Sequence, residues 1–337
     1  MMAVAPLPLR PRPVWDDRVL TYSPSYTVDV TYRCAKRCGY CVYRTDEGGL
    51  IEWDVIDAQL DEAVTARARE VLVMSGEQPW LLRDLALRDE AEFVDRVVEI
   101  CRRALRRGLL PHTNVGLLTA DSLARLKPVN VSMGLMLETG TDDLRAHANG
   151  GGKRVADRLR HIEDAGRLRI PFTTGILVGI GESRADRECA LRLIADVAAR
   201  YGHIQEVIVQ NFVPKDGTPM GDLPGATLED MRDTVRLARE ILPGSVAIQV
   251  PPNLLDASWT ALVDDGARDL GGVSANGDSV SPEKRWEPVH VLRGRARDIG
   301  FALEERLPGF APWPLADETL APDLDRVRRI LDTEYGL

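Results

Sequence analysis

The sequence predicts an α/β fold: a (β/α)8 barrel of the TIM type with short N- and C-terminal extensions. Short β-rich runs alternate with amphipathic helical stretches along the chain, which is the pattern of a parallel sheet covered by helices. Several of these runs are apolar almost throughout, as strands buried on both faces are. No long linker or shift in composition divides the 337 residues, and eight units fit one barrel of that length. A doubly wound open sheet is the alternative fold.

The order of the elements follows from the change between a hydrophobic period of about 2 residues and one of about 3.6. Strands are expected at residues 26–32, 70–75, 111–114, 129–137, 171–178, 206–212, 246–250 and 269–273. Helices are expected near residues 55–68, 91–107, 120–126, 153–166, 185–200, 228–241, 256–265 and 289–299. We expect an extended lead-in at residues 1–20, a barrel domain at 21–315 and a helical tail at 316–337.

Composition and charge narrow the classes of function. The formal net charge is −9 and the chain has no basic tract, so we do not expect it to bind nucleic acid. The chain contains no run of about 18 apolar residues, so we expect no membrane span. The proline-rich residues 1–15 lack the continuous apolar segment of a signal peptide. We therefore expect a cytoplasmic protein.

The five cysteines are unevenly distributed. Three of them lie within the eight residues Cys34–Cys41, whereas a secreted disulfide framework would spread its cysteines more evenly. Crowded cysteines in a cytosolic protein indicate metal or redox chemistry. Cys101 and Cys189 lie in amphipathic helical stretches, where we expect both to be buried structural thiols.

The loop Cys34-Ala-Lys-Arg-Cys38-Gly-Tyr-Cys41 has a C-x3-C-x2-C spacing. Three thiolates so close together can bind three irons of a [4Fe–4S] cluster and leave the fourth iron open. An open iron can chelate the amino and carboxylate groups of S-adenosylmethionine (SAM), and electron transfer then releases a 5′-deoxyadenosyl radical. Zinc is the alternative, but a structural zinc site usually needs four ligands. The loop has neither a histidine nor a second cysteine pair.

Polar residues cluster at the expected carboxyl ends of the strands, where the active site of such a barrel lies. Gly76 and Glu77 follow the second strand. A glycine lets the backbone approach a ligand closely, and Glu77 can accept hydrogen bonds from a cationic amine. Glu138 ends the fourth strand. Its carboxylate could hold ribose hydroxyls or the SAM amine, or form a structural ion pair, for example with Arg145 or Arg154.

Imidazole and amide side chains at other strand ends are candidates for substrate binding. His112 could carry a proton or make a structural hydrogen bond. Amides offer a donor and an acceptor together, which suits an uncharged heteroaromatic substrate, although some amides only satisfy loop backbone. A phosphate would instead call for arginine, lysine or a glycine-rich helix start. The expected substrate-binding residues are His112, Asn114, Gln210, Asn211, Gln249 and Asn253.

These motifs, in this order, resemble the 7,8-didemethyl-8-hydroxy-5-deazariboflavin (FO) synthase family, CofG type, of the radical SAM superfamily. The resemblance runs from about residue 20 to 315, and rests on the cysteine loop and on residues 22–27, 75–77, 110–114, 131–138, 170–175, 202–207, 248–253, 269–273 and 306–308. It implies a [4Fe–4S] cluster on Cys34, Cys38 and Cys41, with SAM as the second cofactor. Residues 175–182 resemble the G-x-I-x-G-x-x-E element that packs beside adenine. The residues implied to contact SAM are Tyr40, Gly76, Glu77, Glu138, Gly179 and Glu182.

The resemblance also implies a reaction and partners. A CofH-type subunit would join a tyrosine-derived fragment to 5-amino-6-(D-ribitylamino)uracil. This chain would then abstract a hydrogen from the adduct, close the middle ring and release ammonia to give FO, with flavodoxin or ferredoxin as electron donor. Residues 42–43, 146–153 and 274–278 depart from the family pattern. A related enzyme acting on another aromatic or uracil-derived substrate is therefore an alternative, as is a non-catalytic iron–sulfur or zinc protein.

Overall fold

The computed structural model describes residues 18–148 and 152–310, and eight parallel strands close into a barrel at its centre. Neighbouring strands pair in the order β2-β3-β4-β5-β6-β7-β8-β1, and a further pairing of β1 with β2 closes the ring. This confirms the expected barrel, and the open sheet is wrong. The strands are β1 (Val19–Asp29), β2 (Glu70–Met74), β3 (Leu110–Asn114), β4 (Ser132–Gly134), β5 (Phe172–Val178), β6 (Ile204–Asn211), β7 (Ala247–Gln249) and β8 (Asp269–Ser274).

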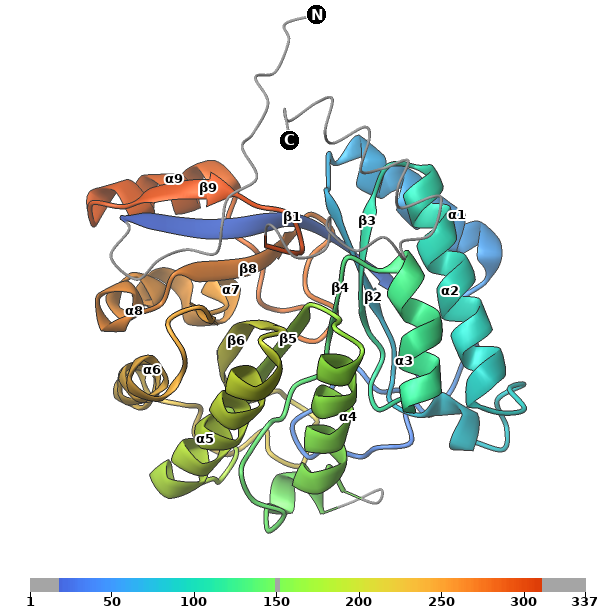
Figure 1. The fold of residues 1–337 in the computed structure, drawn as a ribbon, viewed down its shortest axis with the longest axis horizontal. Coiled ribbons are helices and arrows are strands. Elements are labelled where there is room, and N and C mark those ends of the chain that lie inside the picture. The colour runs from blue at the N-terminus through green and yellow to red at the C-terminus, as the bar shows by residue number, and fades with distance from the viewer. Residues whose placement is uncertain (1–17, 149–151, 311–337) are drawn as a thin grey trace, which may run out of the picture.

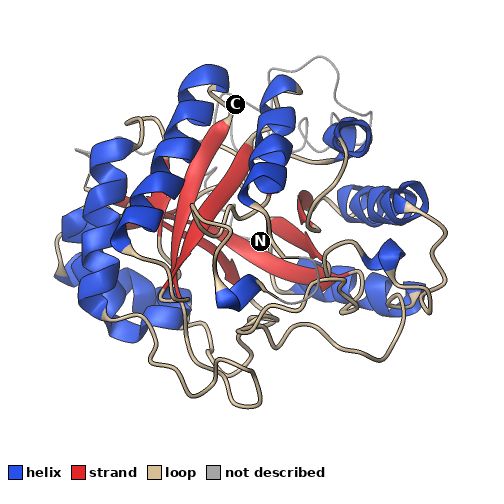
Figure 2. Ribbon diagram, turned by 90° about the horizontal axis from the view of Figure 1, so that it is seen from below, coloured by secondary structure: helices blue, strands red, loops and turns tan. Residues whose placement is uncertain are grey.

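Helices form a layer outside the strands (Figures 1 and 2). Their apolar faces pack on the barrel, and β5 is buried along its whole length. Two of the helices, α5 and α6, begin with capping boxes that satisfy amides of the first turn. The helices are α1 (Trp53–Thr65), α2 (Glu90–Arg106), α3 (Ala120–Leu126), α4 (Val155–Arg167), α5 (Arg184–Tyr201), α6 (Leu228–Ile241), α7 (Pro252–Leu255), α8 (Trp259–Asp265) and α9 (Val289–Asp298).

A ninth strand, β9 (Ala302–Glu305), was not expected and lies outside the ring of eight. It pairs with the first four residues of β1, whereas the last five residues of β1 pair with β2. β1 consequently starts at Val19 rather than at residue 26 and ends at Asp29. Polar residues before residue 26, such as Thr21 and Ser23, are buried in this strand, which is why an apolar pattern did not reveal it. β4 is also shorter than the expected 129–137.

The chain after β9 covers the amino-terminal end of the barrel. The carbonyl oxygen of Pro308 accepts hydrogen bonds from Ser132 Oγ at 2.8 Å and from Gln205 Nε2 at 2.9 Å. Ser132 is the first residue of β4, and Gln205 is near the start of β6. Phe310 is buried beside them. The barrel is therefore closed at the end opposite the cysteine loop.

The two isolated cysteines differ in burial. Cys101 is fully buried in α2, as expected. Cys189 in α5 is exposed, so the expectation of a buried thiol is wrong there. The buried face of α5 runs through Ala190, Leu191 and Ile194, and position 189 lies off that face. No helix of the described residues is long and apolar enough to cross a membrane. Most of the expected lead-in and the whole expected tail (residues 316–337) lie outside the described residues.

Candidate active site

The cysteine loop after β1 is held against the loop after β2. Cys34 Sγ accepts hydrogen bonds from the backbone N–H groups of Glu77 at 3.2 Å and Lys36 at 3.4 Å. Gly76 permits this close approach, because a Cβ at that position would lie 2.2 Å from the carbonyl oxygen of Arg33. The two motifs that the sequence analysis singled out are therefore adjacent in space.

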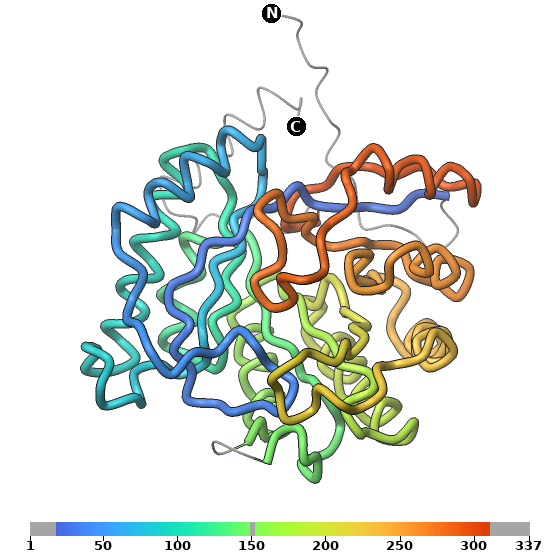
Figure 3. Tube along the Cα trace, turned by 180° about the vertical axis from the view of Figure 1, so that it is seen from behind, coloured from blue at the N-terminus to red at the C-terminus, as the bar shows by residue number. Residues whose placement is uncertain are grey.

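Two further loops support the cysteine loop. The N–H of Gly39 donates to the carbonyl oxygen of Ala146 at 2.8 Å, and the N–H of Met220 donates to the carbonyl oxygen of Gly39 at 3.0 Å. Figure 3 shows the blue loop after β1 beside the yellow loop after β6. The hydroxyl of Tyr40 lies 3.0 Å from Nε2 of His147. The loop is thus anchored on several sides before any ligand binds.

A cavity of about 290 Å³ lies against this loop. Its wall combines the three clustered thiols with two carboxylates that follow β-strands, and with cations that include one before α4 and one within it. These lining residues are Cys34, Cys38, Cys41, Glu77, Glu138, Lys153 and Arg158. Tyr40, Gly76 and Asn114 also line it. The expected iron ligands and four of the expected SAM contacts, Tyr40, Gly76, Glu77 and Glu138, therefore face one space.

The two carboxylates and two cations form a buried ion network. Arg158 donates to Glu77 at 2.8 Å and lies 3.8 Å from Glu138, which also accepts from Lys153. Burial alone would raise the pKa of Glu77, but the charges of Arg158 and then Lys153 outweigh it, so the pKa is lowered. Burial likewise opposes the ionisation of Glu138, and the charges of Lys153 and Arg158 again lower the pKa. Both groups are anionic at neutral pH.

The backbone at Glu138 is strained. Its φ of 74° lies in the left-handed region, which a non-glycine residue seldom adopts. The neighbouring strand holds it there, because the N–H of Glu138 donates to the carbonyl oxygen of Gly175 at 3.0 Å and its own carbonyl accepts from Leu177 at 2.9 Å. Such strain clusters at functional sites, and here it directs a carboxylate into the cavity beside the cysteine loop.

The residues fit an iron–sulfur cluster with SAM. Oε1 of Glu77 is buried and accepts no hydrogen bond from the described residues, although the Lys36 ammonium is 4.0 Å away. An unfilled anionic acceptor beside Cys34 suits a cationic amine. Burial raises the pKa of the Cys34 thiol, and the two backbone amides oppose this by favouring the thiolate.

The arrangement differs from that of a single-ion site. Across residues 18–148 and 152–310, no three His, Cys, Asp or Glu side chains converge closely enough to hold one metal ion. Each thiolate of a cubane cluster binds a different iron, so a cluster does not need that convergence. A tetrahedral zinc ion would need it.

A second cavity of about 200 Å³ extends into the barrel interior. The two cavities share a belt of lining residues: Met74, Asn114, Met136, Ile208, Gln210 and Val280. Of the expected substrate-binding residues, those that line the second cavity are His112, Asn114, Gln210, Gln249 and Asn253. A molecule in the barrel would thus adjoin whatever the cysteine loop holds.

Three of the expected site residues do not line either cavity. Asn211 Nδ2 donates to the carbonyl oxygen of Leu254 at 3.0 Å. Glu182 accepts from the backbone N–H groups of Gly179 and Ile180, each at 2.8 Å. In this structure Asn211, Gly179 and Glu182 stabilise turns that border the site. Their direct contact with substrate or SAM stays a prediction.

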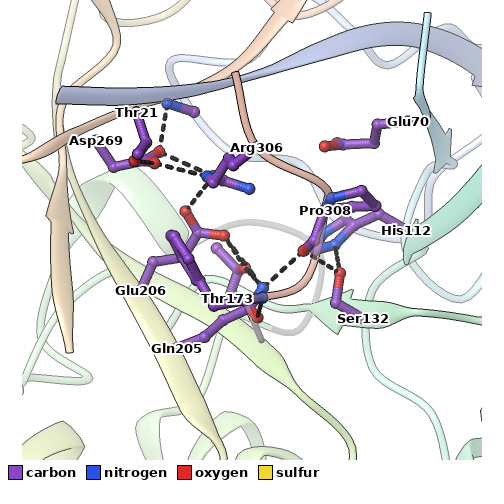
Figure 4. Close-up of polar contacts among 12 residues, drawn as sticks. Thr21, Glu70, His112, Ser132, Thr173, Gln205, Glu206, Asp269, Arg306 and Pro308 are labelled. Carbon is purple, nitrogen blue, oxygen red and sulfur yellow. Dashed lines mark hydrogen bonds and ion pairs between the residues drawn. The ribbon is translucent and has the colours of Figure 1, made fainter. Parts of the chain in front are cut away.

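A compact polar cluster occupies the closed end of the second cavity (Figure 4). Arg306 donates to Asp269 through Nε at 2.6 Å and through a terminal nitrogen at 2.8 Å, and to Glu206 at 2.7 Å. Glu70 and His112 lie across from this guanidinium. All five side chains are buried, and all except Asp269 line the cavity.

His112 has a defined tautomer. Its Nδ1 lies 2.6 Å from Ser132 Oγ, and the Ser132 hydroxyl donates its only hydrogen to Pro308. Ser132 must therefore accept from His112, so Nδ1 carries the proton and Nε2 is an acceptor. Burial, followed by the charge of Arg306, lowers the pKa of His112 to about 3. The ring is neutral at physiological pH.

The cations that line the two cavities were not predicted from the sequence. Glu138 pairs with Lys153 and Arg158 and not with Arg145 or Arg154, which were the examples given for a structural ion pair. Lys153 follows the glycine run Gly150–Gly152, and no local pattern identified it as an ion-pair partner. Arg158 sits on the buried face of α4, where an arginine within an apolar stripe could have indicated a buried ion pair. Arg306 begins segment 306–308, one of those that carry the family resemblance, but its ion pairs were not predicted.

A closed (β/α)8 barrel with a C-x3-C-x2-C loop at the carboxyl ends of its strands, beside a buried ion network, defines a radical SAM enzyme. The model of the radical SAM superfamily matches residues 28–194. A 7,8-didemethyl-8-hydroxy-5-deazariboflavin synthase from Archaeoglobus fulgidus is 45% identical over 300 residues, covering 86% of this chain and 90% of its own. The synthase of the same name from Methanoregula boonei is 42% identical over 324 residues, covering 93% and 97%. The chain belongs to the 7,8-didemethyl-8-hydroxy-5-deazariboflavin synthase family.

Solved structures share the fold. Methylornithine synthase superposes with a TM-score of 0.64 at 17% identity, covering 85% of this chain and 84% of that one. HydG, a maturase of the [FeFe]-hydrogenase, superposes with a TM-score of 0.71 at 15% identity, covering 95% and 71%. The family establishes a radical SAM enzyme of deazaflavin biosynthesis whose cofactors are a [4Fe–4S] cluster and SAM. The alternative of a non-catalytic iron–sulfur or zinc protein is wrong.

Proposed function

We propose that this enzyme converts the adduct of a tyrosine-derived fragment and 5-amino-6-(D-ribitylamino)uracil into FO. The observation that carries the proposal is the continuity of the two cavities. The cavity at the cysteine loop and the amide-lined cavity in the barrel share a belt that includes Asn114 and Gln210. A substrate in the barrel would therefore lie next to SAM, as hydrogen abstraction requires.

On the cofactor side, Cys34, Cys38 and Cys41 would hold the cluster. The unfilled acceptor of Glu77 and the anionic Glu138 would orient the amine and hydroxyl groups of SAM. When bound, the cluster and SAM supply a 5′-deoxyadenosyl radical. The protein would hold SAM and the substrate next to each other, and it would exclude water and competing hydrogen donors.

On the substrate side, amide side chains would form hydrogen bonds with the edge of the uracil ring. Oδ1 of Asn253 is buried without a hydrogen-bond partner among the described residues, while its Nδ2 donates to Asp278 at 2.8 Å. A ring N–H could satisfy that acceptor. Gln249 reaches the cavity because Gly271 leaves space, since a Cβ there would lie 2.1 Å from Gln249 Nε2. Apolar side chains in the shared belt, such as Met136, would flank the phenol ring.

The partners belong to the same proposal. A CofH-type subunit would supply the adduct, and flavodoxin or ferredoxin would supply electrons. We place the reaction in the cytoplasm, because crowded cysteines that serve as metal ligands are typical of a reducing compartment.

An anaerobic assay tests the proposal. The reconstituted enzyme is incubated with SAM, a reductant and the purified adduct, and both 5′-deoxyadenosine and fluorescent FO are measured. Cys38→Ala is the matched control, and we expect it to yield neither product. If 5′-deoxyadenosine forms only with another aromatic or uracil-derived substrate and FO never appears, the proposed substrate is wrong.

A further inference from the structure

The closed end of the barrel cavity holds more carboxyl groups than cations. Glu70, Glu206 and Asp269 are each at most 7% exposed and surround a single guanidinium, that of Arg306. Three ionised carboxylates beside one cation would leave a net negative charge in the barrel interior. Uncompensated buried charge is costly, and a carboxyl group avoids the cost by keeping its proton.

The hydrogen bonds that Asp269 and Glu206 accept favour the ionised form of these two carboxyls. Asp269 accepts from Arg306 twice, from Thr21 and from the N–H of Gly271. Glu206 accepts from Arg306 at 2.7 Å and also from Thr173 at 2.8 Å and from Gln205 at 3.3 Å.

Glu70 is the exception. Its carboxyl accepts a long hydrogen bond from Ser25 Oγ at 3.4 Å, and the hydroxyl of Ser23 also acts to lower its pKa. No described cation forms an ion pair with it. Figure 4 draws dashed lines from Arg306 to Asp269 and Glu206 and none to Glu70. Burial raises the pKa of Glu70 and of Glu206, and the hydrogen bonds decide that Glu70 keeps the proton.

We propose that this closed end is the polyol site of the enzyme, in which Glu70, as a neutral carboxylic acid, binds hydroxyl groups of the ribityl chain. The inference rests on the proposed function and adds to it which end of the substrate enters first. A carboxylic acid has both a donor and an acceptor, as does each hydroxyl of a polyol. Ser25, Thr27 and Thr173 line the same cavity and extend the match.

The position of Glu70 supports this orientation. Glu70 is the first residue of β2, whereas Gly76 and Glu77 follow the last residue of that strand at the cysteine loop. The strand spans four residue steps of about 3.3 Å each. The group bound at Glu70 therefore lies well away from the radical, which suits the unreactive polyol. The segment after β9 closes the space beneath it through Pro308.

Binding of two stable probes tests the proposal. The probes are 6-(D-ribitylamino)uracil and 6-(methylamino)uracil, which differ only in the polyol, and affinities are measured by calorimetry on the full-length reconstituted protein without reductant. We expect the wild type to bind the ribityl probe roughly tenfold more tightly or better, the effect of one or two hydrogen bonds. Glu70→Gln should keep most of this preference because an amide also donates and accepts, whereas Glu70→Leu should lose it.

The other outcomes are distinct. Equal affinity of the wild type for both probes would overturn the polyol site and leave the proposed substrate standing. Failure to bind either probe would overturn the proposed substrate class together with this inference. Loss of the preference in Glu70→Gln as well as in Glu70→Leu would show that an anionic carboxylate is needed, and would overturn the neutral acid.

A spectroscopic measurement does not depend on whether Glu70→Leu folds. In protein labelled with ¹³C at the glutamate carboxyl carbon, the Glu70 signal is assigned by its absence in Glu70→Gln. We expect the chemical shift of a protonated acid at pH 7. The shift of an ionised carboxylate at that pH would contradict the proposal.

Discussion

The backbone N–H of Glu77 donates a 3.2 Å hydrogen bond to the Sγ of Cys34, although the two residues lie in loops that follow different strands. This bond joins the first cysteine of the cluster motif to the acid that faces the same cavity. The ligand loop and the expected SAM-binding loop therefore form one structural unit. We expect a substitution in either loop to alter the conformation of both.

The three clustered cysteines should each be required for the iron–sulfur cluster. Replacing Cys34, Cys38 or Cys41 with alanine leaves two thiolates, too few to hold a cubane with one open iron. We expect iron and sulfide to fall from about four per chain to near zero, and SAM cleavage to be lost. Cys189→Ala is the control, since that thiol is exposed on α5. A cluster retained in Cys38→Ala would contradict the assignment.

Glu77→Gln should weaken SAM binding. The change replaces a charge-assisted hydrogen bond with a neutral one, a loss of roughly 1–2 kcal/mol, or about 5- to 30-fold in affinity. Titration of the reconstituted protein with SAM measures this. Glu163→Gln is a matched control, because Glu163 also pairs with arginines of helices but at the surface. Equal effects of the two substitutions would mean that Glu77 has a structural role only.

Arg306→Met should destabilise the fold strongly. The guanidinium is the partner of both Asp269 and Glu206, and removal of one member of a buried ion pair costs roughly 3–5 kcal/mol. Urea unfolding measures the loss. Adding Glu206→Gln and Asp269→Asn to the variant should restore part of the stability, because the uncompensated charges are then gone. Arg232→Met should cost much less, because the Arg232 guanidinium is solvent-exposed and its partner Asp265 keeps a second cation, Arg236.

The closed-end cluster should make stability depend on pH. Burial raises the pKa of Glu70 in the folded protein above the value of about 4.3 for an unfolded glutamate. Between these values the folded state holds a proton that the unfolded chain has released. Stability is therefore greatest below about pH 4.3 for this contribution and declines as pH rises, by up to about 1.4 kcal/mol per pH unit for one proton.

Glu70→Gln distinguishes the pH dependence caused by Glu70 from that caused by other titrating groups. The amide cannot ionise, so the variant should lose less stability than the wild type between pH 5.5 and 7.5 in urea unfolding. Glu229→Gln, at an exposed ion pair with Arg236, should leave the wild-type dependence unchanged. Identical pH profiles for wild type and Glu70→Gln would place the proton elsewhere.

His112 should remain neutral across the physiological range. Its pKa is lowered to about 3, first by burial and then by the charge of Arg306. Nitrogen-15 NMR should show a protonated Nδ1 and an unprotonated Nε2 with shifts constant from pH 5.5 to 8. In Ser132→Ala the acceptor for Nδ1–H is lost, and we expect a mixture of tautomers. A His112 signal that titrates near pH 6.5 would contradict the buried, hydrogen-bonded environment.

Most of the barrel could be predicted because its signals are local. The β5 segment ends in the apolar run Ile176–Val178, α2 has a helical period, and the cysteines of the loop are close in sequence. The start of β1 could not be predicted, because its Thr21 and Ser23 are polar, and they are buried only once β8 and β9 pair alongside them. The local sequence of a segment does not show which strands will pair with it in the folded protein.

By itself, the sequence determined the alternation of strands and helices, the three-thiolate motif and the family, since each depends on residue types and spacings along the chain. Only the tertiary structure decided the charge states of the buried carboxyls and the cations with which they form ion pairs. Arg158 lies 81 residues from Glu77, and Arg306 lies 100 residues from Glu206. The pKa of a buried carboxyl depends on the distances to such charges and on exclusion of water. Those distances exist only after the barrel has closed, which is why Glu70, an ordinary acid in the sequence, becomes the carboxyl without a cation.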